Sequence, residues 1–243
     1  LEPAGFSFLL VGRLPYKGFF EQKDAETEAA MLRADGFDTC VSPVTAYSTL
    51  GWLDDPVTEP MLRTTHGRIA ETIVHELVHG TIFIPDDAAF NESLATFVGQ
   101  EASVQFFSDP ASAAEQRAKV QDARLLAQQT AEFSAQVKAL YESQTLDVSG
   151  DRAVLESHFR EHVAGLPFRA RTPQQALDLA GKIRLNDACL ALRGTYGSDI
   201  PAFQSQLSDL EGDLGGFIQK MRNAAQSPHP RDALSTPRTP SQN

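Results

Sequence analysis

Two histidines, four residues apart, lie in a stretch whose apolar residues repeat with helical spacing. Between residues 61 and 80 the apolar positions include Ile73 and Leu77, which mark one stripe of a helix. On that helix His75 and His79 project from one face, one turn apart, so both imidazoles can reach a single ion. This pattern constrains the fold strongly, because such a site requires a buried helix that holds its ligands rigidly.

The residues around the two histidines complete the pattern of a zinc peptidase. Glu76 lies about 100° around the helix axis from His75, where its carboxylate would stand beside the ion. There it would act as general base toward an activated water and later as general acid. Glu92 follows His79 by thirteen residues and supplies the third protein ligand that a catalytic zinc needs. We therefore expect Zn²⁺ bound by His75, His79 and Glu92.

The segment between the two parts of this pattern contains further polar residues. Asp86 or Asp87 is expected to cap the helix that carries Glu92, because an aspartate accepts hydrogen bonds from the first backbone N–H groups. Together with Asn91, these aspartates are also expected to orient His75 or His79 from outside the ligand shell.

The inverted pattern, His-x-x-Glu-His, occurs as "HFREH" from His158 to His162. Its neighbours include Glu156 and Arg160, which are typical of a solvated helix face, whereas His75 has apolar neighbours. No acidic helix follows His162 at short range, and the next segment is basic. We expect this second pattern to be structural.

The apolar residues along the rest of the chain predict an α+β, mainly helical fold. Short apolar runs with Gly and Pro breaks at 6–20 and 37–52 are typical of strands, and 24–36 between them is typical of a helix. Beyond the helix at 61–80 and the one starting near Asp87, helices are predicted at 111–141, 152–163, 173–196 and 201–221.

The domain organisation follows from this pattern. Residues 1–222 are predicted to form one domain, with a small N-terminal sheet in 1–60 and a helical part in 61–222. Residues 223–243 are rich in Pro and Ser and are predicted to form a disordered tail.

Composition excludes several classes of protein. The net charge of −11 argues against a broad nucleic-acid interface. No apolar run approaches the ~20 residues of a membrane-spanning helix. The chain starts at Leu1, as in a mature form or a fragment, so any signal segment would not be visible in this sequence. Cys40 and Cys189 are the only cysteines, and they are interpreted as buried thiols, although they could pair.

Longer phrases resemble a known family. "HELVH" followed by "FNESLATFVG" resembles the Glu-zincin peptidases, whose third ligand is the Glu of an Asn-Glu-x-x-Ala segment. With "PYKGFF" and "AYSTLGWLDDPV" before it and "LNDACLALRGTYGSDIPAF" after it, the chain resembles the bacterial zinc aminopeptidase family over about 6–221. The resemblance implies a zincin-like fold, an active-site helix with the HExxH motif and a peptide substrate. It also implies the cell envelope or periplasm, with a cytoplasmic location left open.

Peptide hydrolysis requires more groups than a metal and a base. Tyr196 is the preferred donor for the oxyanion, with Tyr47 as the other candidate. Tyr47 belongs to "AYSTLGW", which could be an edge strand that holds substrate by backbone hydrogen bonds. A free ammonium needs a fixed carboxylate, for which Asp54, Asp55 and Glu101 are candidates. Residues expected to line or brace the cleft are Tyr16, Lys17 and Trp52.

The sequence thus predicts a zinc-dependent metallopeptidase, and an aminopeptidase in particular. Two alternatives remain open at this stage. One is an endopeptidase with the same metal site, and the other is a non-catalytic helical binding protein that contains zinc. Glu76 argues against the second, because a structural zinc site needs no base. The oligomeric state is left open.

Overall fold

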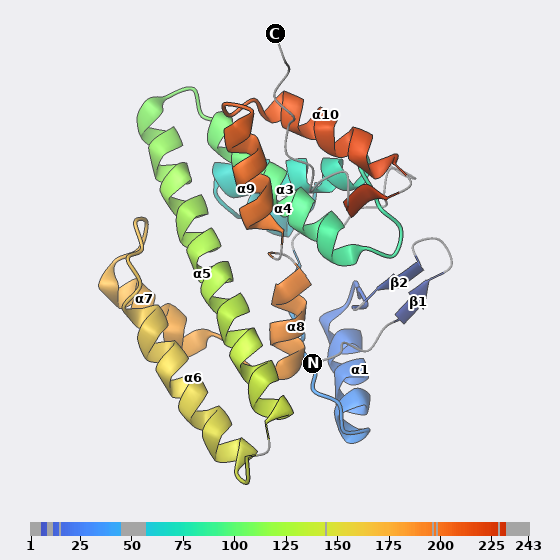
Figure 1. Ribbon diagram of the computed structural model, residues 1–243, viewed down its shortest axis with the longest axis vertical. Coiled ribbons are helices and arrows are strands. Elements are labelled where there is room, and N and C mark those ends of the chain that lie inside the picture. Colours follow the sequence, from blue (N-terminus) through green and yellow to red (C-terminus); the bar gives the residue numbers. More distant parts are fainter. Residues whose placement is uncertain are drawn as a thin grey trace.

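The chain folds as an assembly of helices. A computed structural model describes residues 6–8, 12–14, 16–44, 57–143, 145–195, 197, 199–227 and 229–231. The first elements are β1 (Phe6–Phe8), β2 (Gly12–Leu14), α1 (Gln22–Ala34), α2 (Glu59–Leu62), α3 (His66–His79) and α4 (Ala88–Gln105). They are followed by α5 (Pro110–Glu142), α6 (Val148–Ala164), α7 (Pro173–Lys182), α8 (Asp187–Thr195), α9 (Ile200–Asp209) and α10 (Leu214–Ala225) (Figure 1).

The prediction of an α+β fold with a small N-terminal sheet is wrong. In the described residues, strands β1 and β2 only pair with each other, with Phe6 opposite Leu14, in a hairpin of three-residue strands at the edge of the molecule (Figure 1). Such a hairpin is not a sheet layer on which helices can pack. Of the other predicted strand region, residues 37–44 have no regular secondary structure, and 45–56 lie outside the described residues.

Residues 37–44 are held by cross-links to the α7–α8 connection rather than by a partner strand. Cys40 forms a disulfide with Cys189 of α8, so the interpretation of both as buried thiols is wrong. Around that bond, Arg184 donates to the Val41 carbonyl (2.6 Å), the Asn186 amide to the Thr39 carbonyl (2.9 Å), and the Asp187 backbone N–H to the Asp38 carboxylate (3.1 Å). The carbonyls of Thr39 and Val41, which would accept hydrogen bonds from a neighbouring strand in a sheet, thus accept them from side chains instead.

Two predicted helices are each divided. The predicted helix at 173–196 is interrupted between α7 and α8, and that at 201–221 between α9 and α10. At the second break Glu211 (φ 55°) and Gly212 (φ 82°) take left-handed backbone conformations, which end an α-helix. The start of α7 at Pro173 agrees with the prediction, and Thr172 and Gln175 form a capping box there.

Two apolar cores support the helices, and α5 runs beside both (Figure 1). The first joins α3, α4, α9 and α10 and centres on Phe90, Phe97, Phe203 and Phe217, which are almost inaccessible to solvent. The second joins α5 to α6, α7 and α8, with Phe133 stacked on Phe159 at a centroid distance of 4.5 Å. Removing one such buried ring typically costs about 3–5 kcal/mol of stability.

The end of the described chain packs against the first core. After α10 ends at Ala225, Arg231 pairs with Asp87 (2.7 Å) and Asp199 (2.8 Å). Most of the predicted tail, from residue 232, lies outside the described residues, and the boundary at 222/223 stays a prediction. Among the helices in the described part of the chain, none is long and apolar enough to cross a membrane.

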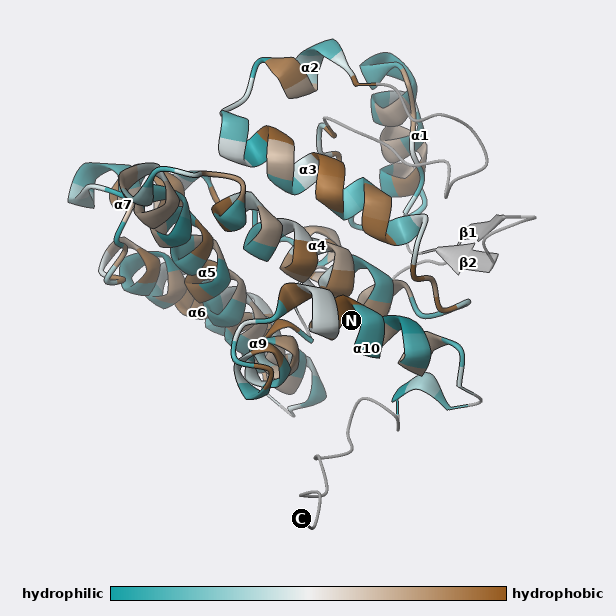
Figure 2. Cartoon of the chain, turned by 90° about the horizontal axis from the view of Figure 1, so that it is seen from above, coloured by the Kyte–Doolittle hydropathy of each residue, from teal (hydrophilic) through white to brown (hydrophobic). Residues whose placement is uncertain are grey.

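Helices α3 and α4 approach each other closely at Gly99. A Cβ at that position would lie 2.6 Å from the Glu71 carbonyl oxygen and 3.4 Å from the His75 backbone nitrogen. Only glycine allows this approach. On the opposite side of α3, Ile73 and Leu77 are 38% and 63% exposed, so the expectation of a buried helix is wrong for this face. Figure 2 shows α3 lying beside α4, with apolar and polar positions alternating along it.

Gly99→Ala is expected to lower the free energy of unfolding by about 1–3 kcal/mol, because the added methyl group forces backbone apart. Urea unfolding followed by circular dichroism measures this change. Gly181→Ala in α7 is the matched control: its Cβ meets nothing within 4 Å, so stability should be unchanged or slightly higher. Equal stability of the Gly99→Ala variant and the wild type would contradict the close approach.

Candidate metal centre

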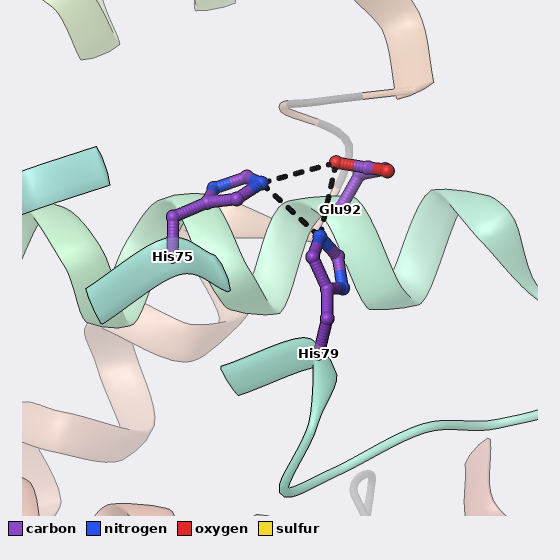
Figure 3. Close-up of side chains that lie close together, drawn as sticks. All are labelled: His75, His79 and Glu92. Atoms are coloured by element: carbon purple, nitrogen blue, oxygen red, sulfur yellow. Dashed lines mark hydrogen bonds and ion pairs between the residues drawn. The ribbon is translucent and has the colours of Figure 1, made fainter. Parts of the chain in front are cut away.

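Three side chains from two neighbouring helices meet at one point. His75 and His79 extend from the last turns of α3, and Glu92 extends from the second turn of α4 (Figure 3). Each offers a donor atom, and the three donor atoms lie within 4.8 Å of one another. His79 and Glu92 are buried, and the His75 side chain is 18% exposed. No other cluster of three such side chains occurs among the described residues.

The distances between the donor atoms fit a tetrahedral ion. The two Nε2 atoms are 3.1 Å apart, and Oε2 of Glu92 lies 3.3 Å from Nε2 of His75 and 3.6 Å from Nε2 of His79. Ligands of a tetrahedral zinc at bond lengths of 2.0–2.1 Å are about 3.3–3.4 Å apart. The triangle of donor atoms therefore has the size that Zn²⁺ requires.

The electrostatics also indicate a cation. Oε2 of Glu92 is buried and receives no well-formed hydrogen bond. Burial by itself raises the pKa of Glu92, but the nearby imidazoles of His75 and His79 outweigh it and hold that pKa well below its usual range. If both imidazoles are neutral and Nε2 carries no proton, the ionised carboxylate and the two nitrogens present three electron pairs to one small space, an arrangement that a bound cation would stabilise.

The second oxygen of Glu92 is held by a residue from the N-terminal part of the chain. The Tyr16 hydroxyl donates to Oε1 at 2.8 Å, which leaves Oε2 directed at the histidines. Sequence analysis expected Tyr16 only to line or brace the cleft. No spacing rule connects two residues 76 positions apart, so this contact could only emerge from the fold.

The predicted orienting roles of Asn91 and Asp87 are wrong. The Asn91 side chain bonds the backbone of Ile84 twice, donating to its carbonyl (2.8 Å) and accepting from its N–H (2.9 Å). Asp87 caps α4 by accepting from the Phe90 N–H (3.1 Å), as predicted, but its charge is paired with Arg231. Both residues fix the turn that leads from His79 to Glu92 rather than the imidazole rings.

Other predicted site residues divide into two groups. Lys17 pairs with Glu28, and Glu101 is buried between Arg117 (2.9 Å) and Arg124 (2.8 Å), so Glu101 is already neutralised. The remaining ones lie outside the described residues, namely Tyr47, Trp52, Asp54, Asp55 and Tyr196.

The second histidine pattern lies on a solvated helix face, as expected. Both His158 and His162 are exposed on α6, and Nε2 of His162 contacts the Gln129 side chain at 2.6 Å. Neither belongs to the cluster that could hold a metal.

Comparison with known proteins identifies the family. Residues 1–234 match the family model described as "Putative aminopeptidase". The chain belongs to this family. No curated protein and no solved structure matches the chain significantly. The predicted resemblance to an aminopeptidase family is thereby confirmed, whereas the zinc ion and the roles of the individual residues stay predictions.

The metal centre opens into a cleft with a volume of about 1880 Å³. Glu76, half-buried on α3, lines this cleft together with the three candidate ligands and Tyr16. Loop 37–44 and α8, the two segments joined by the disulfide, also line this cleft. The volume is large enough for several residues of a peptide.

Glu71 is a residue of this cleft that sequence analysis missed. It lies one turn before His75 on α3, where the spacing of four residues could have revealed it. Burial raises the pKa of Glu71, against the opposing charges of Arg68, His75 and Arg124. Its carboxylate accepts from Arg68 at 2.9 Å.

Tyr16→Phe is expected to weaken zinc binding by about 10-fold, because Oε1 of Glu92 loses the donor that orients the carboxylate. Competition with a chromogenic chelator measures the affinity. Tyr141→Phe is the matched control, since the Tyr141 hydroxyl contacts Arg152 and no residue of the metal centre. Unchanged zinc affinity in Tyr16→Phe would show that the tyrosine does not orient Glu92.

Proposed function

We propose that this protein is a zinc-dependent metallopeptidase that removes residues from the N-terminus of peptides. One observation carries the proposal: three donor atoms, spaced for a tetrahedral ion, lie in the wall of a peptide-sized cleft with a glutamate beside them. Membership of a family described as aminopeptidases supports the reaction class and a peptide substrate.

The roles of the residues follow from their chemistry. A zinc ion at His75, His79 and Glu92 would polarise the peptide carbonyl and make a water nucleophilic near neutral pH. Glu76 accepts the proton of the attacking water and passes it to the leaving amine. Tyr16 keeps the carboxylate of Glu92 oriented by its hydrogen bond.

The residues that hold the substrate complete the proposal. Tyr196 is assigned to the oxyanion and Tyr47 to backbone contacts with the peptide. Asp54 and Asp55 are assigned to the free ammonium, because Glu101, the third candidate, is already paired with two arginines. These four assignments rest on the sequence alone.

Glu76→Gln is expected to keep zinc and to lose hydrolysis by a factor of about 10²–10⁴, because the amide cannot accept a proton. Zinc content by elemental analysis and turnover of a peptide library measure the two properties. Glu115→Gln, on the exposed face of α5, is the matched control and should retain both. Full activity of Glu76→Gln would remove the assigned base.

An aminopeptidase must recognise a free ammonium, so N-acetylated peptides are expected to be cut at least about 10-fold more slowly than the same peptides with free N-termini. Mass spectrometry of the products from matched peptide pairs measures this ratio and locates the cleaved bond. Equal cleavage of both forms at internal bonds would instead indicate an endopeptidase with the same metal site.

The disulfide supports a location in an oxidising compartment. Cys40 and Cys189 close a loop of 149 residues, and such bonds persist outside the reducing cytosol. We therefore propose the cell envelope or periplasm as its location. Labelling of both thiols by an alkylating reagent in intact cells would contradict this location.

A further inference from the structure

The cleft that contains the candidate metal centre is also lined by two arginines for which the described residues show no acidic partner. Arg184, between α7 and α8, and Arg193, in the last turn of α8, both line the cavity that contains His75 and Glu92. Among the described residues, neither of these two arginines forms an ion pair.

The other arginines of this region differ in that respect. Arg68 pairs with Glu71 (2.9 Å), and Arg124 pairs with Glu101 (2.8 Å). Arg152 pairs with a glutamate of its own helix and with Asp187 (3.0 Å). Each of these three guanidinium groups therefore has a carboxylate partner, whereas Arg184 and Arg193 have none within the part of the chain that the structure describes.

The positions of the two unpaired arginines are fixed by the cross-links of loop 37–44. Arg193 follows Cys189 by four residues, so both lie on one face of α8, the face that the disulfide ties to Cys40. Arg184 donates through Nη1 to the Val41 carbonyl at 2.6 Å, which anchors its side chain on the same loop. Both guanidinium groups are thus presented from rigid backbone.

The positive charge of Arg184 also acts on Arg193. Burial lowers the pKa of Arg193, and the positive charge of Arg184 lowers it further. The neighbouring charge that acts most on Arg193 is thus another positive charge. The repulsion between the two guanidinium groups raises the free energy of the charged state, and an anion bound between them would offset this repulsion.

We propose that Arg184 and Arg193 form a subsite for a carboxylate of the peptide substrate. The proposal rests on the proposed peptidase function, since it takes the cleft to be a peptide site. A guanidinium group offers a planar fork of N–H donors that matches the two oxygens of a carboxylate. Both a C-terminal carboxylate and an acidic side chain supply this group.

The experiment uses zinc-loaded protein with the Glu76→Gln change, which binds peptides without turning them over. Three tetrapeptide probes are compared by calorimetry: tetra-alanine, its C-terminal amide, and an amide whose last residue is glutamate. The free acid is expected to bind about 10- to 100-fold more tightly than the plain amide. Tight binding of the glutamate amide assigns the subsite to a side chain, and tight binding of the free acid assigns it to the C-terminus.

In the same Glu76→Gln protein, Arg193→Gln is expected to lower the affinity for the free acid to that for the amide. Arg193→Lys is expected to retain part of the preference for the free acid over the amide. Arg222→Gln, an exposed arginine on α10 away from the cleft, is the matched control and should keep the full preference. Thermal unfolding of each variant verifies that it is folded.

Two results would overturn the proposal. The first is equal binding of all three probes by the parent protein, including no binding of any probe. The second is a preference for the carboxylate-bearing probe that Arg193→Gln leaves unchanged. Failure of the proposed peptidase function would be detected by other measurements: the protein that retains Glu76 would contain no zinc or would not cleave peptides. Because the acid-to-amide ratio is a binding measurement, it separates the two failures.

Discussion

The contact between α3 and α4 at Gly99 is the constraint on which the candidate site depends. His75 and His79 belong to one helix and Glu92 to the other, so the separation of the helices sets the distances between the three donor atoms. The close approach places the α4 backbone against the carbonyl of Glu71 and the nitrogen of His75. A larger residue at 99 would separate the helices by a few tenths of an ångström, which is comparable with the tolerance of a zinc bond.

The N-terminal part of the chain contributes to the site through two long-range connections. Tyr16 reaches Glu92 by a hydrogen bond, and Cys40 reaches Cys189 by a disulfide. Between these anchors the chain forms a wall of the cleft, because residues from Tyr16 to Val44 line it. This segment is thus held by the helical body, and it forms part of the cleft that contains the candidate metal centre.

The sequence was informative where the relevant geometry is local. The pairing of His75 with His79 follows from the rise of a single helix, and the position of Glu92 follows from a short turn that ends at the cap Asp87. It was uninformative for Tyr16 and Cys40, whose partners are set by tertiary packing across 76 and 149 residues. The α+β assignment failed for the same reason, since apolar runs with Gly and Pro breaks fit extended chain held by side chains as well as they fit strands.

The arrangement of charges around the cleft would orient a bound peptide. Helix α8, which carries Arg193, packs on both α4 and α5, so the arginine wall has a fixed position relative to Glu92. A peptide in extended form advances about 3.3 Å per residue. If a carboxylate is anchored at Arg184 and Arg193 as proposed, this anchor would determine which peptide bond lies at the candidate metal centre. An ammonium site elsewhere in the cleft would then limit the number of residues between the two ends of the substrate. An exopeptidase built this way would select substrates of a certain length, because both charged ends of the peptide must be bound. The two arginines would also attract carboxylates locally, in a protein whose net charge of −11 otherwise repels them.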